Sequence, residues 1–210
     1  MDNKKLDFMA TLTEAVEYGV KNVASLILMA VLYIVTVWIP YLNVGTTIGL
    51  YKGIVEISKG KVLNPMILFD KSNFENIGNF FILIGIMFVA LIPAYCMMII
   101  PGIVLEIAWG FALYFMIDKG LSPMECMRKS YDVTYGEKWT IFFLYLVLCV
   151  VASVVIGLLG MIPKVGWLFI LVGAVCLTAI TISLEAVLYK HFSAKAFPEE
   201  AIETVEEITE

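Results

Sequence analysis

Four long runs of uncharged residues limit what this chain can fold into. They cover residues 22–51, 79–105, 139–163 and 165–184, and none contains Asp, Glu, Lys, Arg or His. A helix needs about 20 apolar residues to cross the hydrocarbon core of a bilayer, and each run is long enough. With 61% hydrophobic residues, the chain is also too apolar for a soluble domain. The sequence therefore predicts an all-α, polytopic membrane protein whose main partner is the lipid bilayer.

Prolines divide these runs into shorter helical segments. Residues 80–117 are too long for one crossing, because a helix rises about 1.5 Å per residue through a core about 30 Å thick. We expect turns at Pro40, Pro101 and Pro163, each of which follows an isoleucine, and a kink at Pro93. Six membrane segments are thus predicted, near residues 23–39, 42–57, 79–100, 102–117, 139–161 and 165–189.

The basic residues predict how these segments are oriented. With six crossings and a cytoplasmic N-terminus, thirteen of the fourteen Lys and Arg residues fall on the cytoplasmic side, and only Lys164 falls outside. Such a bias is typical of cytoplasmic loops. We therefore expect a multi-pass protein of the cytoplasmic (inner) membrane of a prokaryote, with both termini in the cytoplasm. Residues 42–57 are the weakest segment, which is tilted, partly re-entrant, or continued into the cytoplasm as a polar helix.

A shared motif predicts that the membrane domain contains three repeats. The stretches VLNPMILFDKSNFENIGNFF (62–81) and GLSPMECMRKSYDVTYGEKW (120–139) match at a constant offset of 58 residues, and LDFMATLTEAVEYGVKN near the N-terminus is a weaker match. Each repeat would consist of an amphipathic interfacial helix followed by a helical hairpin. Parallel repeats of this kind are related by an axis along the membrane normal. The predicted membrane domain is residues 1–197, with repeats near 6–61, 62–120 and 121–192.

The third interfacial helix has the clearest start signal. Ser122 is suited to cap its N-terminus, Pro123 to occupy its first turn, and Glu125 to complete a capping box. Together with the weaker Asn64-Pro65 start in the second copy, this predicts helices that lie along the membrane surface or pack beneath the spans.

The same stretch carries a family resemblance. The pattern L-S-P-x-E-x-x-R-K-S-x(5)-G-x-x-W at 121–139 is followed by two segments and ends in SLEAVLYKHF. It resembles the membrane domain associated with glycerophosphoryl diester phosphodiesterases and related polytopic prokaryotic families of unknown function. The resemblance covers most of residues 6–192 and implies a helical membrane architecture. It implies no catalytic residue, and phosphodiesterase activity is not expected, because this sequence contains no soluble phosphodiesterase domain.

Small residues in the second segment suggest close helix packing. Gly45, Gly49 and Gly53 form a G-x-x-x-G-x-x-x-G stripe, which allows the backbones of two membrane helices to approach closely. Lys52 and Glu56 lie beside the stripe, four residues apart. The stripe either packs within one chain or forms a contact in a homo-oligomer around a polar axis.

Two acids lie within predicted membrane segments. Glu106 is four residues from both Gly102 and Gly110, and Glu185 is five residues before Lys190. An acid in a membrane segment suggests an ion or substrate site. Each of these acids also lies close to a predicted interface, so a structural role stays open. The candidate polar positions are therefore Lys52, Glu56, Glu106 and Glu185, and the candidate packing positions are Gly45, Gly49, Gly53, Gly102 and Gly110.

The rest of the sequence argues against an enzyme. It has no G-x-S-x-G, H-E-x-x-H, C-x-x-C or phosphate-binding loop, and its four cysteines are scattered singly. We therefore expect no catalytic residue, no metal site and no cofactor. The exposed bases are few and alternate with acids, which also argues against nucleic-acid binding.

Two functions stay open from the sequence. One is a self-associating, channel-like, transporter-like or lipid-binding protein for a small solute or ion. The other is a membrane scaffold or regulator whose cytoplasmic helices and acidic tail bind partner proteins. The tail, residues 198–210, holds six Glu and no base. An anionic leaflet would repel it, so it either stays in solvent or docks on a basic surface.

Overall fold

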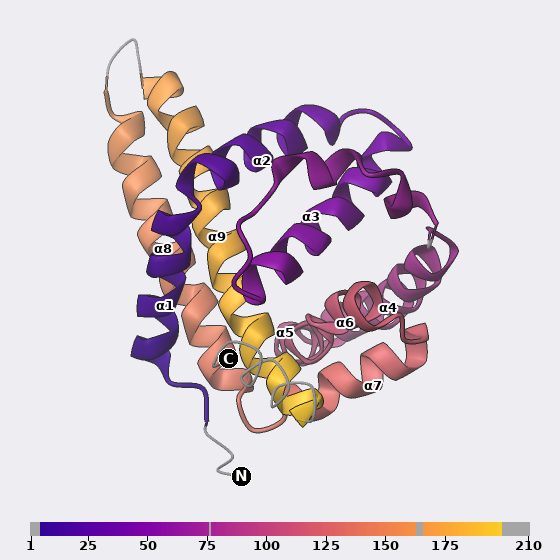
Figure 1. The fold of residues 1–210 in the computed structure, drawn as a ribbon. Coiled ribbons are helices and arrows are strands. Elements are labelled where there is room, and N and C mark those ends of the chain that lie inside the picture. The colour runs from indigo at the N-terminus through magenta and orange to yellow at the C-terminus, as the bar shows by residue number, and fades with distance from the viewer. Residues whose placement is uncertain (1–4, 76, 163–165, 199–210) are drawn as a thin grey trace, which may run out of the picture.

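The computed structural model describes residues 5–75, 77–162 and 166–198 (Figure 1). Helices dominate these ranges and no strand occurs in them, so the predicted all-α class is confirmed. In chain order the elements are α1 (Phe8–Lys21), α2 (Val23–Thr36), α3 (Leu42–Ser58), the 3₁₀ helices η1 (Pro65–Phe69) and η2 (Lys71–Phe74), α4 (Ile77–Met97), α5 (Ile99–Trp109), α6 (Ala112–Lys119), α7 (Pro123–Thr134), α8 (Lys138–Gly160) and α9 (Gly166–Ala196).

Of the three predicted proline turns, one is confirmed: Pro40 lies in the turn between α2 and α3. Pro93 lies inside α4 and does not end it, and the predicted kink there stays a prediction. The prediction of a break at Pro101 is wrong: the break is at Met98, whose backbone is extended, and Pro101 lies in the first turn of α5. A proline fits there because the first turn of a helix leaves its N–H groups without intrahelical partners. Pro163 lies outside the described residues.

Several helices are long and apolar enough to cross a membrane. Only 11% of the residues in the apolar windows of α4 and α8 are buried within the chain, and a soluble protein would not expose such surfaces to water. A multi-pass membrane protein is therefore supported. The candidate spans are Ile77–Met97, Ile99–Lys119, Lys138–Gly160 and Leu168–Ala196, with α1 and α2 as a fifth that is bent by 84°.

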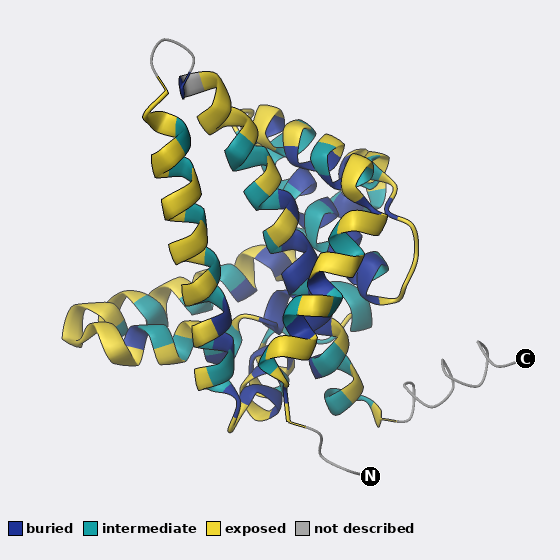
Figure 2. Cartoon of the chain, turned by 90° about the vertical axis from the view of Figure 1, so that its left-hand side faces the viewer, coloured by how far each residue is buried: buried dark blue, intermediate teal, exposed yellow. Residues whose placement is uncertain are grey.

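Six crossings are not confirmed. The predicted second segment forms α3, which has 17 residues and is not among the long apolar helices. Nor do the helical pairs share one axis. Figure 2 shows two exposed pairs projecting from a common body in different directions; they are α8–α9 and α4–α5 of Figure 1. The prediction of parallel hairpins therefore has no support here.

The core of the protein surrounds the C-terminal half of α9. Helix α9 packs against α1, α2, α3, α7 and α8, and Leu188, Tyr189 and Phe192 of its C-terminal half are almost completely buried. Tyr189 stacks on Tyr114 of α6 with ring centroids 5.2 Å apart. The N-terminal half of α9 instead pairs with α8 in the exposed projection (Figure 2). One helix therefore belongs to both the buried body and the apolar surface.

The glycine stripe of α3 faces η1 and η2 of the same chain. A Cβ atom at Gly49 would lie 2.7 Å from Leu68 Cα, and one at Gly45 would lie 2.2 Å from the ring of Phe74. Gly53 makes the same kind of close approach to Met29. Because this stripe is covered within the chain, it offers no free surface for self-association.

Residues 65–74 do not form the predicted amphipathic α-helix. They form η1 and η2, separated at Asp70, whose side chain accepts a hydrogen bond from Ser72 N. Asn73 Nδ2 donates to the carbonyl oxygens of Ile67 (2.9 Å) and Leu68 (3.3 Å). These side chains replace the hydrogen bonds of a regular α-helix and hold the segment against α3.

The predicted start of the third interfacial helix is confirmed. Ser122 and Glu125 form a capping box at α7, with Pro123 in the first turn. Ser130 of α7 donates to Ala108 O (2.8 Å) and accepts from Phe111 N (3.2 Å), so it bridges the break between α5 and α6.

The matching serine of the second copy makes different contacts. Ser72 accepts a hydrogen bond from Lys52 Nζ at 2.8 Å, whereas Ser130 joins two backbone groups across a helix break. The shared sequence motif thus does not give a shared structure at this position. The threefold repeat stays a prediction.

We expect Gly49→Ala to destabilise the protein, because the added methyl group would clash with the backbone of η1. The free energy of unfolding should fall by about 1 to 3 kcal/mol, which is typical of overpacking. The thermal midpoint in detergent measures this. Gly85→Ala is the matched control, since no atom lies within 4 Å of its added Cβ. Equal midpoints for both variants would contradict the packing described for α3.

Candidate functional site

The carboxylates in and beside the apolar helices fall into two groups according to their partners. Asp118 and Glu137 form ion pairs with basic side chains. Glu106 and Glu185 each accept a hydrogen bond from a tyrosine hydroxyl instead. A buried carboxylate with cationic partners serves as a structural link, whereas one with only a neutral donor still needs its charge neutralised.

Glu137 joins three distant parts of the chain. It precedes α8 and is only 6% exposed. Its carboxylate accepts hydrogen bonds from His191 Nε2 (3.0 Å) and Lys195 Nζ (2.6 Å) of α9, and from Leu6 N (3.2 Å) before α1. Burial favours the neutral acid, but the hydrogen bonds from His191 and Lys195 outweigh it and hold the pKa of Glu137 below its ordinary value.

Asp118 forms a second link at the end of α6. It pairs with Lys59, which follows α3, and with Lys119 at 3.4 Å, and it accepts a hydrogen bond from Tyr189 Oη of α9 at 2.7 Å. The Asp118 side chain is only 4% exposed. Its charge is therefore balanced by cations from two segments that are far apart in the sequence.

Glu185 lies on α9 beside a group of tyrosines. Tyr114 Oη of α6 donates to its carboxylate, and the ring of Tyr51 of α3 packs edge-on to Tyr114 with centroids 4.7 Å apart. Among the described residues no basic side chain forms an ion pair with Glu185.

Glu106 belongs to the projecting α4–α5 pair. Tyr95 Oη of α4 donates to its carboxylate, and the side chain of Glu106 is exposed. Gly102 makes this arrangement possible, because a Cβ there would lie 2.4 Å from the ring of Tyr95. Gly110 has a different role, since only the backbone of its own helix lies near the position of its Cβ.

The four polar positions predicted from the sequence do not form one site. Lys52 bonds to Ser72, and Glu56 is half-buried at the far end of α3. Within the described ranges no hydrogen bond or ion pair joins any two of Lys52, Glu56, Glu106 and Glu185. Of the four, only Glu185 lies on α9, the helix that the core surrounds, where it accepts a hydrogen bond from a tyrosine of α6.

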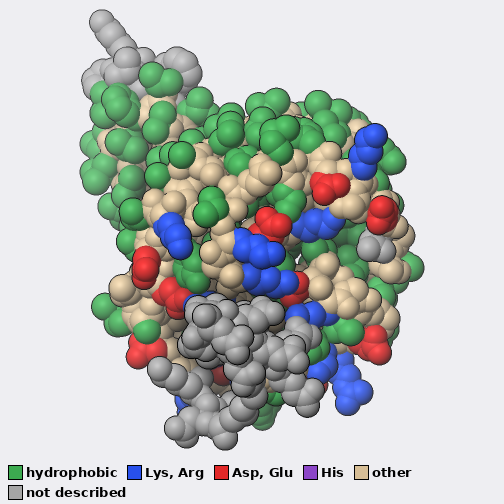
Figure 3. Space-filling model, viewed as in Figure 1, with side chains coloured by type: hydrophobic (Ala, Val, Ile, Leu, Met, Phe, Trp, Pro, Cys, Tyr) green, Lys and Arg blue, Asp and Glu red, His purple; other side chains and the backbone are tan. Residues whose placement is uncertain are grey.

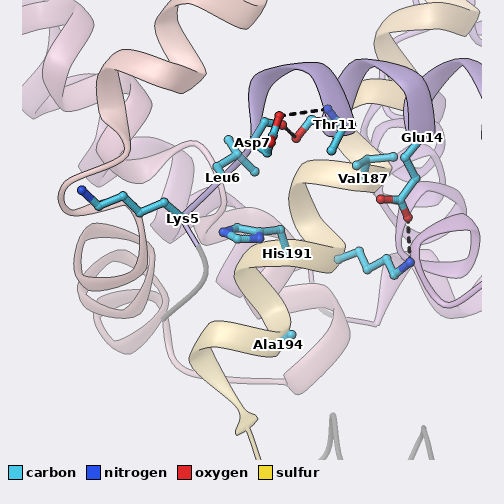
Figure 4. Close-up of a pocket in the computed structure, with 10 residues that line it drawn as sticks. Lys5, Leu6, Asp7, Thr11, Glu14, Val187, His191 and Ala194 are labelled. Atoms are coloured by element: carbon cyan, nitrogen blue, oxygen red, sulfur yellow. Dashed lines mark hydrogen bonds and ion pairs between the residues drawn. The ribbon is translucent and has the colours of Figure 1, made fainter. Parts of the chain in front are cut away.

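A pocket of about 270 Å³ lies between α1 and α9 (Figure 4). Most of the charged side chains that line it have partners within the protein. Lys190 Nζ lies 2.7 Å from Glu14 Oε1, and the Asp7 side chain caps α1. His191 bonds to Glu137, and Lys5 points away from the other labelled residues in Figure 4. Because Lys190, Glu14, Asp7 and His191 already have partners within the protein, the pocket is a weaker candidate than the site at Glu185.

Sequence reasoning missed Asp118, Glu137, Tyr95 and Tyr114. Asp118 directly follows an apolar stretch and Glu137 lies just before one, which is a usable signal for an acid at a membrane boundary. The tyrosines carry no such signal, because their partners lie 11 and 71 residues away. Only the three-dimensional structure pairs them with the acids.

Comparison of this chain with models of known families, with characterised proteins and with solved structures finds no match. The resemblance to the membrane domain associated with glycerophosphoryl diester phosphodiesterases therefore stays a prediction.

We expect Glu137→Gln to destabilise the protein by about 3 kcal/mol at pH 7, as removal of one partner from a buried ion pair typically does. The effect should depend on pH. The folded pKa of Glu137 is lowered, so its contribution is complete above the unfolded pKa, about 4.3, and is lost as the pH falls through the folded pKa. Thermal midpoints of the two proteins should therefore converge in acid.

The control is Glu17→Gln, which changes an exposed acid of α1 and should leave the midpoint unchanged. A difference between wild type and Glu137→Gln that is as large at pH 3 as at pH 7 would contradict the role given to the Glu137 charge.

Proposed function

We propose that this protein is a non-enzymatic, multi-pass membrane protein that binds and passes a small cationic solute, with Glu185 as the binding group. One observation carries the proposal: the half-buried Glu185 carboxylate accepts a hydrogen bond from Tyr114 and has no cationic partner among the described residues. The proposed orientation has both termini in the cytoplasm of a prokaryotic cell, with the exposed apolar faces of the α8–α9 and α4–α5 pairs in contact with lipid.

Electrostatics explains why this carboxylate would take a cation. An unpaired carboxylate in apolar surroundings costs several kcal/mol, so it either takes up a proton or acquires a positive partner. One hydrogen bond from a neutral hydroxyl to the carboxylate contributes about 1.5 to 3 kcal/mol, which does not offset the loss of solvation of the charge. A bound cation would stabilise it much more and would leave when the carboxylate is protonated.

The neighbouring aromatic rings favour the same class of ligand. The Tyr51 and Tyr114 rings pack beside each other near Glu185, and aromatic faces attract cations by about 1 to 2 kcal/mol when water is excluded. Glu106 is less suited to this role, because its side chain is exposed on the α4–α5 pair with Tyr95 as its neighbour.

Uptake into proteoliposomes tests the proposal. Purified protein should take up K⁺ or tetramethylammonium above the level of empty vesicles. Glu185→Gln should reduce this uptake at least about tenfold. Tyr114→Phe should also reduce it at least about tenfold, the loss expected from one hydrogen bond of about 1.5 to 3 kcal/mol to a charged group. Tyr114→Phe keeps the ring and thus the packing, so it separates binding from folding.

Glu17→Gln is the matched control and should transport like the wild type. Uptake of both probes that is unchanged in Glu185→Gln would contradict the proposal. Uptake that never exceeds that of empty vesicles would also contradict it and would favour a scaffold or regulatory role.

A further inference from the structure

The C-terminal end of α9 leads into a group of basic side chains. The ring of Phe197 lies under Lys119 Nζ at 5.1 Å and Lys129 Nζ at 4.9 Å, measured to the ring centroid. Phe197 also packs against Phe115 of α6, with ring centroids 5.9 Å apart. The chain therefore leaves the described part of the structure from a position held between α6 and α7.

Three lysines define this basic patch: Lys59, Lys119 and Lys129. Lys59 and Lys119 share the buried Asp118, and Lys129 Nζ donates to Ala196 O at 3.5 Å. The three lysines therefore concentrate basic side chains beside the end of α9. Figure 3 shows Lys and Arg side chains mixed with Asp and Glu side chains over the middle of this face, whereas hydrophobic side chains dominate its upper edge.

The next segment of the chain has the complementary charge. Residues 199–210 lie outside the described residues, and their sequence holds six Glu and no base. They follow Pro198 directly, and twelve extended residues reach about 40 Å. Direct attachment gives a tail an effective concentration in the millimolar range at a nearby site, so individually weak ion pairs suffice for docking.

We propose that residues 199–210 dock on the basic patch of the same chain and exclude anionic lipid headgroups from it. On the predicted cytoplasmic face, an anionic leaflet attracts the lysines and repels the glutamates. Tail and leaflet therefore compete for one surface. This inference does not depend on Glu185, and a failure of cation uptake would leave it unaffected.

Protection of the tail from a glutamate-specific protease tests this proposal. The full chain is placed in nanodiscs that hold one copy each, with phosphatidylcholine as the only lipid, and cleavage is followed by intact mass. We expect the double variant Lys119→Gln/Lys129→Gln to be cleaved at least about fivefold faster than the wild type. Lys129→Gln alone keeps the Asp118 ion pairs and should show an intermediate rate. Thermal midpoints verify that each variant is folded.

Lys61→Gln is the matched control, since Lys61 is exposed and lies outside the patch. The tail of this variant should be cleaved at the wild-type rate. Salt at 0.5 M should also accelerate cleavage, because it reduces the screening length to a few ångströms. A free peptide of the tail sequence corrects for the effect of salt on the protease.

The remaining outcomes distinguish other occupants of the patch. Cleavage should accelerate when phosphatidylglycerol replaces part of the phosphatidylcholine, because anionic headgroups displace the tail; an unchanged rate would refute the competition. Equal rates for wild type and the double variant would overturn the docking itself. Protection found only in nanodiscs with two copies would overturn docking within one chain and assign the patch to a second copy.

Discussion

The cations that bind Asp118 and Glu137 decide how the helices of this protein fit together. In lipid the hydrophobic effect does not drive helices toward one another, so packing and polar contacts determine their arrangement. Glu137 holds the start of α1 and the end of α9 to the beginning of α8. Asp118 likewise holds α3, α6 and α9 together. These two carboxylates thus fix the central body from which the apolar pairs project.

This arrangement separates two uses of acidic residues in one chain. At Asp118 and Glu137 the desolvation of the charge is offset by lysine and histidine side chains, so the groups are structural. At Glu185 the same kind of group faces tyrosines and has a single donor. Within the described residues, Asp118 and Glu137 have cationic partners, whereas Glu185 has only a neutral one, and this difference is the physical basis for proposing ligand binding at Glu185. It also explains why the glycine stripe is not needed for that role: Gly49 serves the packing of η1.

Local patterns predicted the helices of this fold well. The capping box of Ser122 and Glu125, the turn at Pro40 and the helical pairs themselves follow from short-range rules. The break at Met98 was missed because a proline such as Pro101 is equally compatible with the first turn of a helix. In these cases the residues that decide the structure are neighbours in the sequence, or nearly so.

Long-range features could not be predicted in this way. The partners of Glu137 on α9 lie 54 and 58 residues away, and Tyr114 lies 71 residues from Glu185. In the η1–η2 segment, the Asn73 side chain bonds to the backbone of Ile67, and that stretch lies against Gly49 of α3. These contacts compete with the formation of a regular α-helix. The directions of the two projecting pairs depend on all of these contacts together.

The reactivity of a cysteine placed at position 185 tests the central claim most directly. In a background without the four native cysteines, the account predicts that Glu185→Cys reacts with a cationic, membrane-impermeant thiol reagent, and that tetramethylammonium slows this reaction. Such behaviour would show that a hydrophilic cation reaches the position from water. Reaction only with neutral, lipid-soluble reagents, or no effect of the added cation, would contradict the assignment of Glu185 as the binding group.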